Sequence, residues 1–162
     1  SYPKHSVSEI ESLNGKRESF ESEILLRADQ LELNTEIKSA IESIRLQAGS
    51  LMKLGNVTKK SVPKMTLISE PLNGGALNTR SFIPHRAHSS IGVFAAITVA
   101  TACAIPDTVA ASLAQVPHSG VYEIEHPSGC TKVQLELDDK GVIERTGIIR
   151  TARKLMDGTV YA

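Results

Sequence analysis

The chain has 162 residues, of which 41% are hydrophobic and 22% charged, enough for one domain with a buried core. Its 18 Lys and Arg residues balance its 18 Asp and Glu residues, so there is no net charge to hold a nucleic acid backbone or an anionic membrane. With three Phe, three Tyr and no Trp, it also has few aromatic side chains on which single-stranded bases stack. The composition excludes a disordered tail and argues against nucleic acid and membrane partners.

The two cysteines, Cys103 and Cys130, are too few for a disulfide framework and do not form a CxxC metal pair. We therefore expect a reducing compartment, most simply the cytoplasm, and no metal site. The segment from Ser1 to Glu23 is polar, unlike a signal peptide. The most apolar run, residues 91–105, is shorter than the roughly 20 residues that cross a bilayer.

The first part of the chain predicts an arm, an edge strand and a helix. Residues 1–19 have the composition of a polar arm or connection, which leaves residues 20–162 as the folded domain. The segment 20–26 alternates enough for an edge strand. An amphipathic helix is predicted over about 36–54, capped by Asn34 or Thr35 and ended by Gly55. Its apolar positions are Ile37, Ile41, Ile44, Ala48 and Leu51.

The rest of the chain predicts strands around one apolar helix. Strands are expected at 65–69, 77–83, 121–125, 131–137 and 142–150, with turns at 127–129 and 138–141. No charged residue occurs between Ala87 and Pro106, so a helix over about 88–105 should be buried on most sides and end at Pro106. The fold class predicted is α+β: a mostly antiparallel sheet wrapped around this helix, with the amphipathic helix outside.

The entry to the apolar helix is the most informative segment for function. A helix N-terminus offers unpaired backbone N–H groups and a partial positive charge, which suit a carboxylate or phosphate. Arg86 adds a cation there, His88 can exchange a proton near neutral pH, and Ser89 and Ser90 add hydroxyl groups. The alternative is that Ser89 caps the helix while His85, Arg86 and His88 lie in solvent.

Three further features have weaker signals. His126 and Ser128 belong to a turn that could be a simple hairpin connection, and the cationic segment 150–154 could be a solvated chain end. Cys103, inside the apolar helix, should be inert with an ordinary or raised pKa, and Cys130 has no fixed base beside it except His126. Lys64 is expected at the surface where a strand begins.

Four stretches together resemble, in this order, the C-terminal half of the PrpF family. They are Pro63-Lys64, the run from Phe82 to Cys103, His126-Pro127-Ser128-Gly129, and Arg150 to Met156 with Gly158. Members of that family are cofactor-independent isomerases of di- and tricarboxylates, such as methylaconitate and methylitaconate isomerases and 4-oxalomesaconate tautomerase. The resemblance implies half of a diaminopimelate-epimerase-like fold, with the PrpF-type C-terminal domain over residues 20–162.

The resemblance also implies a site and a partner. Arg86, His88, Ser89, Ser90, Ile91 and Ser128 would hold the carboxylates of a small di- or tricarboxylate, with no cofactor. The family's proton-shuttling Lys and Cys belong to the N-terminal half, and neither Lys64, Cys103 nor Cys130 matches them. An N-terminal domain or second subunit would therefore complete the cleft.

Two alternatives remain open. The chain could be a homodimeric binding or assembly module, or a repurposed isomerase or cyclase that uses His85, His88 or His126 as acid and base.

Overall fold

A computed structural model describes residue 31 and residues 33–160 of the chain. The predicted arm (1–19) and the predicted edge strand (20–26) lie outside these residues. Within the described residues, no helix has both the length and the apolar character needed to span a lipid bilayer.

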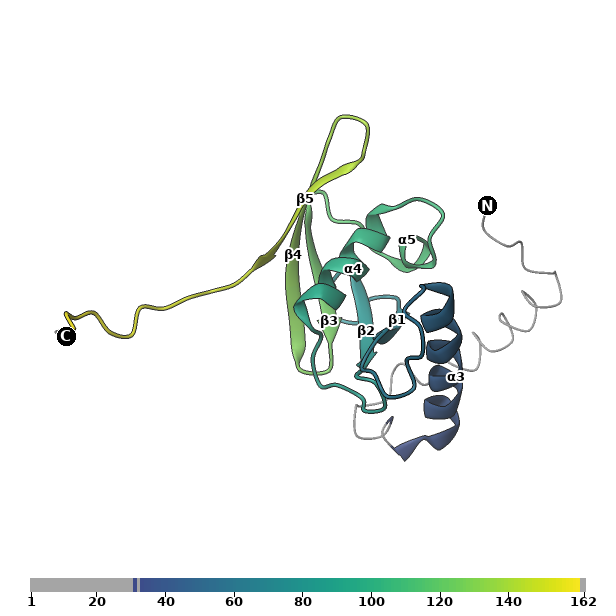
Figure 1. Ribbon diagram of the computed structural model, residues 1–162. Helices are drawn as coiled ribbons and strands as arrows, with labels where there is room; N and C mark the ends of the chain where they lie inside the picture. The colour runs from purple at the N-terminus through teal and green to yellow at the C-terminus, as the bar shows by residue number, and fades with distance from the viewer. Residues whose placement is uncertain (1–30, 32, 161–162) are drawn as a thin grey trace.

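In the part of the chain that the structure describes, one five-stranded sheet organises the fold (Figure 1). Its strands lie in sequence order: β1 (Met65–Ser69), β2 (Leu77–Phe82), β3 (Val121–His126), β4 (Gly129–Leu137) and β5 (Ile143–Ile149). Only β2 and β3 pair in parallel, because helices connect them, whereas the other neighbours are antiparallel. The predicted α+β class with a mostly antiparallel sheet is confirmed.

The helix α3 (Thr35–Leu51) covers the β1–β2 side of the sheet. Its N-cap is Asn34, as predicted, and the Asn34 side chain accepts a hydrogen bond from the Ile37 N–H. Ile37 and Ile41 form a small core with Phe82 of β2. The helix ends at Leu51, three residues before the predicted end.

The buried face of α3 differs from the predicted one. Its buried residues are Ile37, Ile41, Arg45 and Gly49, one row at a spacing of four along the helix. Ile44 and Leu51, predicted to face the core, are 41% and 74% exposed. The position that Ile44 was expected to fill belongs to Arg45, whose side chain is fully buried.

The helix α4 (Val93–Ala104) lies on the opposite face of the sheet. The two faces are distinguished by neighbouring β1 residues, since Leu67 packs with the α3 core and Ile68 with the α4 core. Ala96, Val99 and Ala100 pack against Tyr122 and Ile124 of β3 and against Val133 and Leu135 of β4. These alanines let the helix approach the strands closely.

Two expectations about the apolar helix need correction. It begins at Val93 rather than near residue 88, because residues 88–92 remain outside the helix and Gly92 has an extended backbone. The sheet does not enclose it: Phe94 is 84% exposed, so one side of α4 faces solvent. A short helix that was not predicted, α5 (Val109–Leu113), follows it and packs against it.

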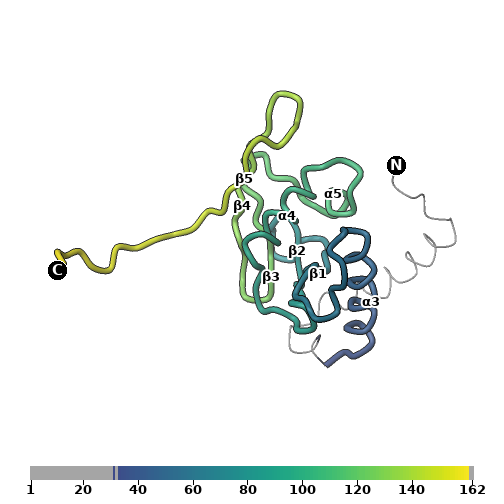
Figure 2. The backbone as a smooth tube through the Cα atoms, in the orientation of Figure 1, coloured from purple at the N-terminus to yellow at the C-terminus, as the bar shows by residue number. Residues whose placement is uncertain are grey.

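The hairpins of the last third are confirmed at both predicted turns. After β5, residues 150–160 form an extended, exposed segment that projects away from the sheet (Figure 2). It carries the cationic residues Arg150, Arg153 and Lys154.

Candidate functional site

The sheet topology gathers the predicted site residues at one end. At this end β1 and β4 begin, while β2, β3 and β5 finish, as the pairs Met65↔Phe82, His126↔Gly129 and Lys132↔Ile149 show. The first residue of α4 also follows the loop that leaves β2 here. We call this the His126 end of the sheet, and the turn between β3 and β4 lies here (Figure 1).

A tight turn after β2 forms one wall of the site. The Ile83 N–H donates to the Arg86 carbonyl oxygen at 3.0 Å, and the His88 N–H donates to the Ser81 carbonyl oxygen at 2.8 Å. These bonds fold the chain back on β2 and place His85 and Arg86 at the exposed tip. A hollow of about 360 Å³ is lined by Ile83, Arg86, Ala87, His88 and Ser89.

The start of α4 has no side-chain cap. Gly92 is the N-cap, so the alternative hypothesis that Ser89 caps the helix is wrong. The ring of His88 instead orders the segment before the helix, since its Nδ1 accepts a hydrogen bond from the Ser90 N–H at 3.1 Å. The same nitrogen lies 3.2 Å from the Ser90 carbonyl oxygen, so the ring contacts both polar backbone atoms of Ser90. The first N–H groups of α4 are thus not satisfied by a cap side chain.

His126 lies at the end of β3 with both ring nitrogens beside hydroxyl groups. Nδ1 is 3.2 Å from Ser128 Oγ, and Nε2 is 3.3 Å from Thr131 Oγ1. Burial lowers the pKa of His126, and the nearby positive charges of Arg80, Arg150 and His88 lower it further, against a hydrogen bond with the Ser89 backbone. The imidazole is therefore neutral at neutral pH, so each nitrogen can act as donor or acceptor through its hydroxyl neighbour.

The same interactions show which predicted clusters come together. His88 and Ser89 from the loop before α4, Ser128 from the β3–β4 turn, and Arg150 at the end of β5 all lie close to His126. Arg86 is exposed beside the hollow. Ile91 is 5% exposed and packs in the α4 core, so its side chain is not available to a ligand.

Two residues at this end were not predicted. Arg80 of β2 is 8% exposed, and its Nη1 donates to Asn78 Oδ1 at 2.9 Å and to the Thr79 carbonyl oxygen at 2.8 Å. Thr131 of β4 is buried beneath His126. Arg80 is the one charged residue in the predicted strand 77–83, and such a residue is normally expected to face solvent, so the sequence carried no signal that it lies at the site.

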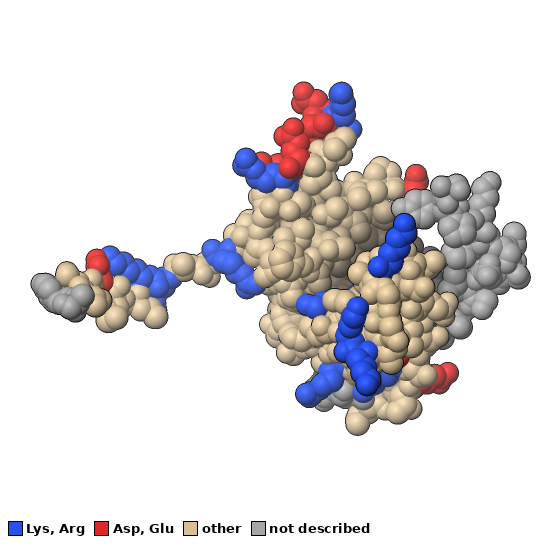
Figure 3. All heavy atoms as spheres, viewed as in Figure 1, with Lys and Arg blue, Asp and Glu red and all other residues tan. Residues whose placement is uncertain are grey.

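Lys64 reaches the start of α4 although it is exposed. Its Nζ lies 4.0 Å from the point where a Cβ on Gly92 would sit. An ammonium group therefore stands beside the uncapped N-terminus of the helix, where both attract negative charge. In the view of Figure 3, several Lys and Arg side chains lie over the lower part of the molecule, whereas the projecting β4–β5 hairpin carries Asp and Glu side chains together with Lys and Arg.

Neither cysteine is suited to nucleophilic chemistry. Burial raises the pKa of Cys103 to about 11, in agreement with the expectation for a thiol inside the apolar helix. Partial burial raises the pKa of Cys130, and the Glu123 carboxylate 3.7 Å from its Sγ raises it further. Among the residues that the structure describes, no three His, Cys, Asp or Glu side chains are grouped as metal ligands.

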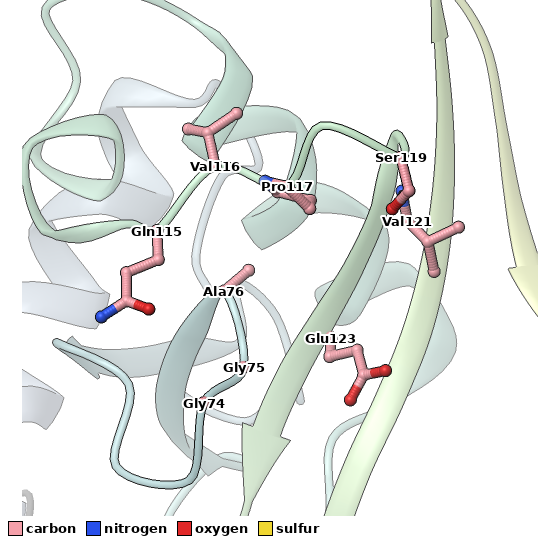
Figure 4. A pocket seen from close by; sticks show the side chains of 9 residues that line it. All are labelled: Gly74, Gly75, Ala76, Gln115, Val116, Pro117, Ser119, Val121 and Glu123. Atoms are coloured by element: carbon pink, nitrogen blue, oxygen red, sulfur yellow. The ribbon is translucent and has the colours of Figure 1, made fainter.

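A second hollow of about 350 Å³ lies between the segment 74–76, the segment 115–117 and β3 (Figure 4). Its one charged residue, Glu123, is already paired with Lys132, with Glu123 Oε1 and Lys132 Nζ 2.7 Å apart. None of the predicted site residues lines it. The His126 end, which combines cations, hydroxyls and the N–H groups at the start of α4, is therefore the stronger site for an anion.

Comparison with known proteins identifies the family. The model of the PrpF protein family matches residues 22–162. The chain is 54% identical over 135 residues to a (4E)-oxalomesaconate Delta-isomerase of Novosphingobium sp. (strain KA1), and 51% identical over 134 residues to a 4-oxalomesaconate tautomerase of Pseudomonas putida. Both alignments cover 82% of the chain. The chain belongs to the PrpF family, as its motifs suggested.

These matches cover only part of each relative. The chain spans 38% of the first of these proteins and 37% of the second. The crystal structure of a methylitaconate-delta-isomerase has a similar fold, with a TM-score of 0.69 and 22% identity over 83% of this chain and 40% of that one.

Proposed function

We propose that this chain is the carboxylate-binding half of a cofactor-independent isomerase or tautomerase that moves a double bond in a di- or tricarboxylic acid by proton transfer. The observation that carries the proposal is the meeting of Arg80, Arg150, His88 and His126 with the uncapped start of α4. We take residues 20–162 as this domain and residues 1–19 as an arm leading to it.

The proposed binding groups suit several carboxylates at once. Arg86 and Lys64 supply positive charge at the two sides of the loop before α4, and Ser89 and Ser90 supply hydroxyl donors. The backbone N–H groups of the first turn of α4, from Val93 onward, point along the helix axis toward the same place. Charge-assisted hydrogen bonds of this kind stabilise the charge that develops on a carboxylate when a proton leaves the adjacent carbon.

His126 and His88 are the proposed proton carriers of this half. A neutral imidazole can accept a proton from carbon or an intervening hydroxyl, and the hydroxyls of Ser128 and Thr131 hold the His126 ring in place. The complementary acid or base would come from a partner half. This division agrees with a chain that spans 38% of a related isomerase.

The partner is proposed to be an N-terminal domain or a second subunit. A homodimeric binding or assembly module is the alternative, favoured by the side chain of Phe94, which is 84% exposed on a helix without charged residues. Sedimentation of the purified chain over a range of concentrations distinguishes them. A dimer that citrate stabilises would indicate that two copies of the chain complete the cleft together. A monomer at all concentrations would exclude the homodimer hypothesis.

Carboxylate binding is tested by titration calorimetry with citrate, aconitate and itaconate. A ligand at about 100 times its Kd raises the free energy of unfolding by about 2.7 kcal/mol, which a thermal scan detects. Arg86→Gln should weaken citrate binding by about tenfold, as expected for loss of one charge-assisted hydrogen bond. The matched control is Arg145→Gln on β5, whose side chain is exposed and paired with Glu136. Equal affinity in both variants would remove Arg86 from the site.

A further inference from the structure

The fully buried Arg45 of α3 anchors a loop that leads into the candidate site. Its Nη1 donates to the carbonyl oxygens of Val57, Lys60 and Val62, the last at 2.8 Å. Val62 is two residues before Lys64, whose ammonium group stands at the start of α4. One guanidinium group therefore holds the segment 57–62, which immediately precedes Pro63 and Lys64.

Arg45 also fixes the carboxylate of Glu42, although its Nη2 shares in the bonding to the Val57 carbonyl oxygen. Arg45 Nε donates to Glu42 Oε2 at 2.6 Å, and Nη2 donates to Oε1 at 2.8 Å, which is a two-point pairing with a single allowed orientation. The hydrogen bond from Arg45 lowers the pKa of Glu42 more than burial raises it, so this carboxylate stays charged.

Glu42 in turn contacts the turn that forms a wall of the site. Its Oε2 lies 3.4 Å from Nδ1 of His85, at the tip of the turn next to Arg86. The turn is also held by the backbone bonds of Ile83 and His88 and by the packing of Ala87 against the α3 core. The His85 side chain is 55% exposed, so packing alone restricts the orientation of its ring only weakly.

We propose that Glu42, oriented by Arg45, is a positioning residue that holds the turn of residues 83–86 and thereby fixes Arg86 at the anion site. The proposal rests on the proposed function for the identity of the ligand. Glu42 itself touches no ligand in this account. It acts through His85. The Glu42–Arg45 pair also links this wall of the site to the loop that precedes Lys64.

The test uses Glu42→Gln in the full chain, because glutamine keeps an oxygen that accepts from Arg45 but loses the charge opposite His85. The matched control is Glu36→Gln, on the exposed first turn of the same helix. Two quantities are measured for each variant and for His85→Ala: exchange of the Ile83 and His88 amide hydrogens in the free protein, and the Kd for citrate.

We expect Glu42→Gln to speed exchange of these two amides by about tenfold. Amides outside the turn and outside the Arg45-bound segment 57–62 should be unchanged. Citrate binding should weaken by about three- to tenfold, and His85→Ala should have the same effects on exchange and on citrate binding. The double variant, Glu42→Gln with His85→Ala, should bind citrate no more weakly than either single variant. Glu36→Gln should match the wild type in both measurements.

Three outcomes would overturn the positioning role. They are unchanged exchange in Glu42→Gln, faster exchange spread over the whole chain, and faster local exchange with unaltered citrate affinity. If the wild-type chain binds no polycarboxylate, the proposed function fails instead, and the exchange data still decide whether Glu42 holds the turn.

Discussion

The buried carboxylate of Glu125 should stabilise the loop before β2 by an amount that can be measured. Glu125 is 4% exposed, on the sheet face opposite α4. Its Oε2 accepts the Leu72 N–H, and its Oε1 accepts the N–H groups of Asn73 and Gly75, each at 2.8 Å. In Glu125→Gln the side-chain oxygen can keep two of these bonds. The side-chain amide nitrogen of the new glutamine then faces the Leu72 N–H, so two donors oppose each other and the Leu72 N–H loses its acceptor.

The cost follows from the bond that is lost. A hydrogen bond to a charged group contributes about 1.5–3 kcal/mol, and a buried donor left without an acceptor costs about 1–3 kcal/mol. We therefore expect Glu125→Gln to lower the free energy of unfolding by about 2–4 kcal/mol, which corresponds to a fall in Tm of about 10 °C for a domain of this size.

The pH dependence gives a second readout. Burial would raise the pKa of Glu125, but the hydrogen bonds from the Leu72, Gly75 and Asn73 backbone outweigh it and lower the pKa. Because the folded pKa is below the unfolded value of about 4.3, the stabilisation is complete above that pH and is lost as the pH falls through the folded pKa. The difference in the free energy of unfolding between the wild type and Glu125→Gln should be largest near pH 7 and should shrink in acid.

Urea unfolding at several pH values measures both effects. The control is Glu123→Gln, two residues earlier on the same strand and face, where an exposed carboxylate pairs with Lys132. A surface ion pair contributes less than about 1 kcal/mol. The reasoning would be refuted if the two variants lost the same stability, or if the loss in Glu125→Gln were independent of pH.

Two shorter predictions concern α4. Ala96→Leu, at a fully buried position, should overpack the helix against the sheet and cost about 1–3 kcal/mol, while Gly92→Ala, whose new Cβ would meet only Lys64 Nζ, should cost far less. Thermal unfolding compares them, and equal Tm values would contradict the packing described. In the native chain a disulfide reagent should modify Cys130 alone, since Cys103 is 2% exposed and its pKa is about 11. Rapid labelling of both thiols would show that α4 opens readily.

The strands and hairpins were predictable because their signals are local. Val133 and Leu135 alternate with polar neighbours, and turn residues separate the strands. The start of α4 was misplaced because Ser89 and Ser90 have the composition of a cap, whereas hydrogen bonding to His88 keeps this segment outside the helix. Arg45 broke the apolar pattern of α3 because its partners are loop carbonyls distant in sequence, which periodicity does not reveal.

The resemblance already placed Ser128 in one site with the loop before α4, but the residues alone did not show that these clusters and Arg150 come together. His88, Ser89, His126 and Arg150 were singled out in three separate clusters. Their proximity depends on the parallel pairing of β2 with β3, which brings the ends of both strands to one end of the sheet. Arg80 was missed because one charged residue in a strand normally faces solvent, and only the tertiary structure shows it beneath the site.

The central claim is that the His126 end of the sheet binds a polycarboxylate, and an amide NMR titration with citrate tests it most directly. The account predicts saturable shifts of the Ser89, Ser90, Gly92 and Gly129 amide signals, which surround this end. Shifts confined to Gly74, Gly75 and Ser119, around the second hollow, or no shifts at saturating citrate, would contradict it.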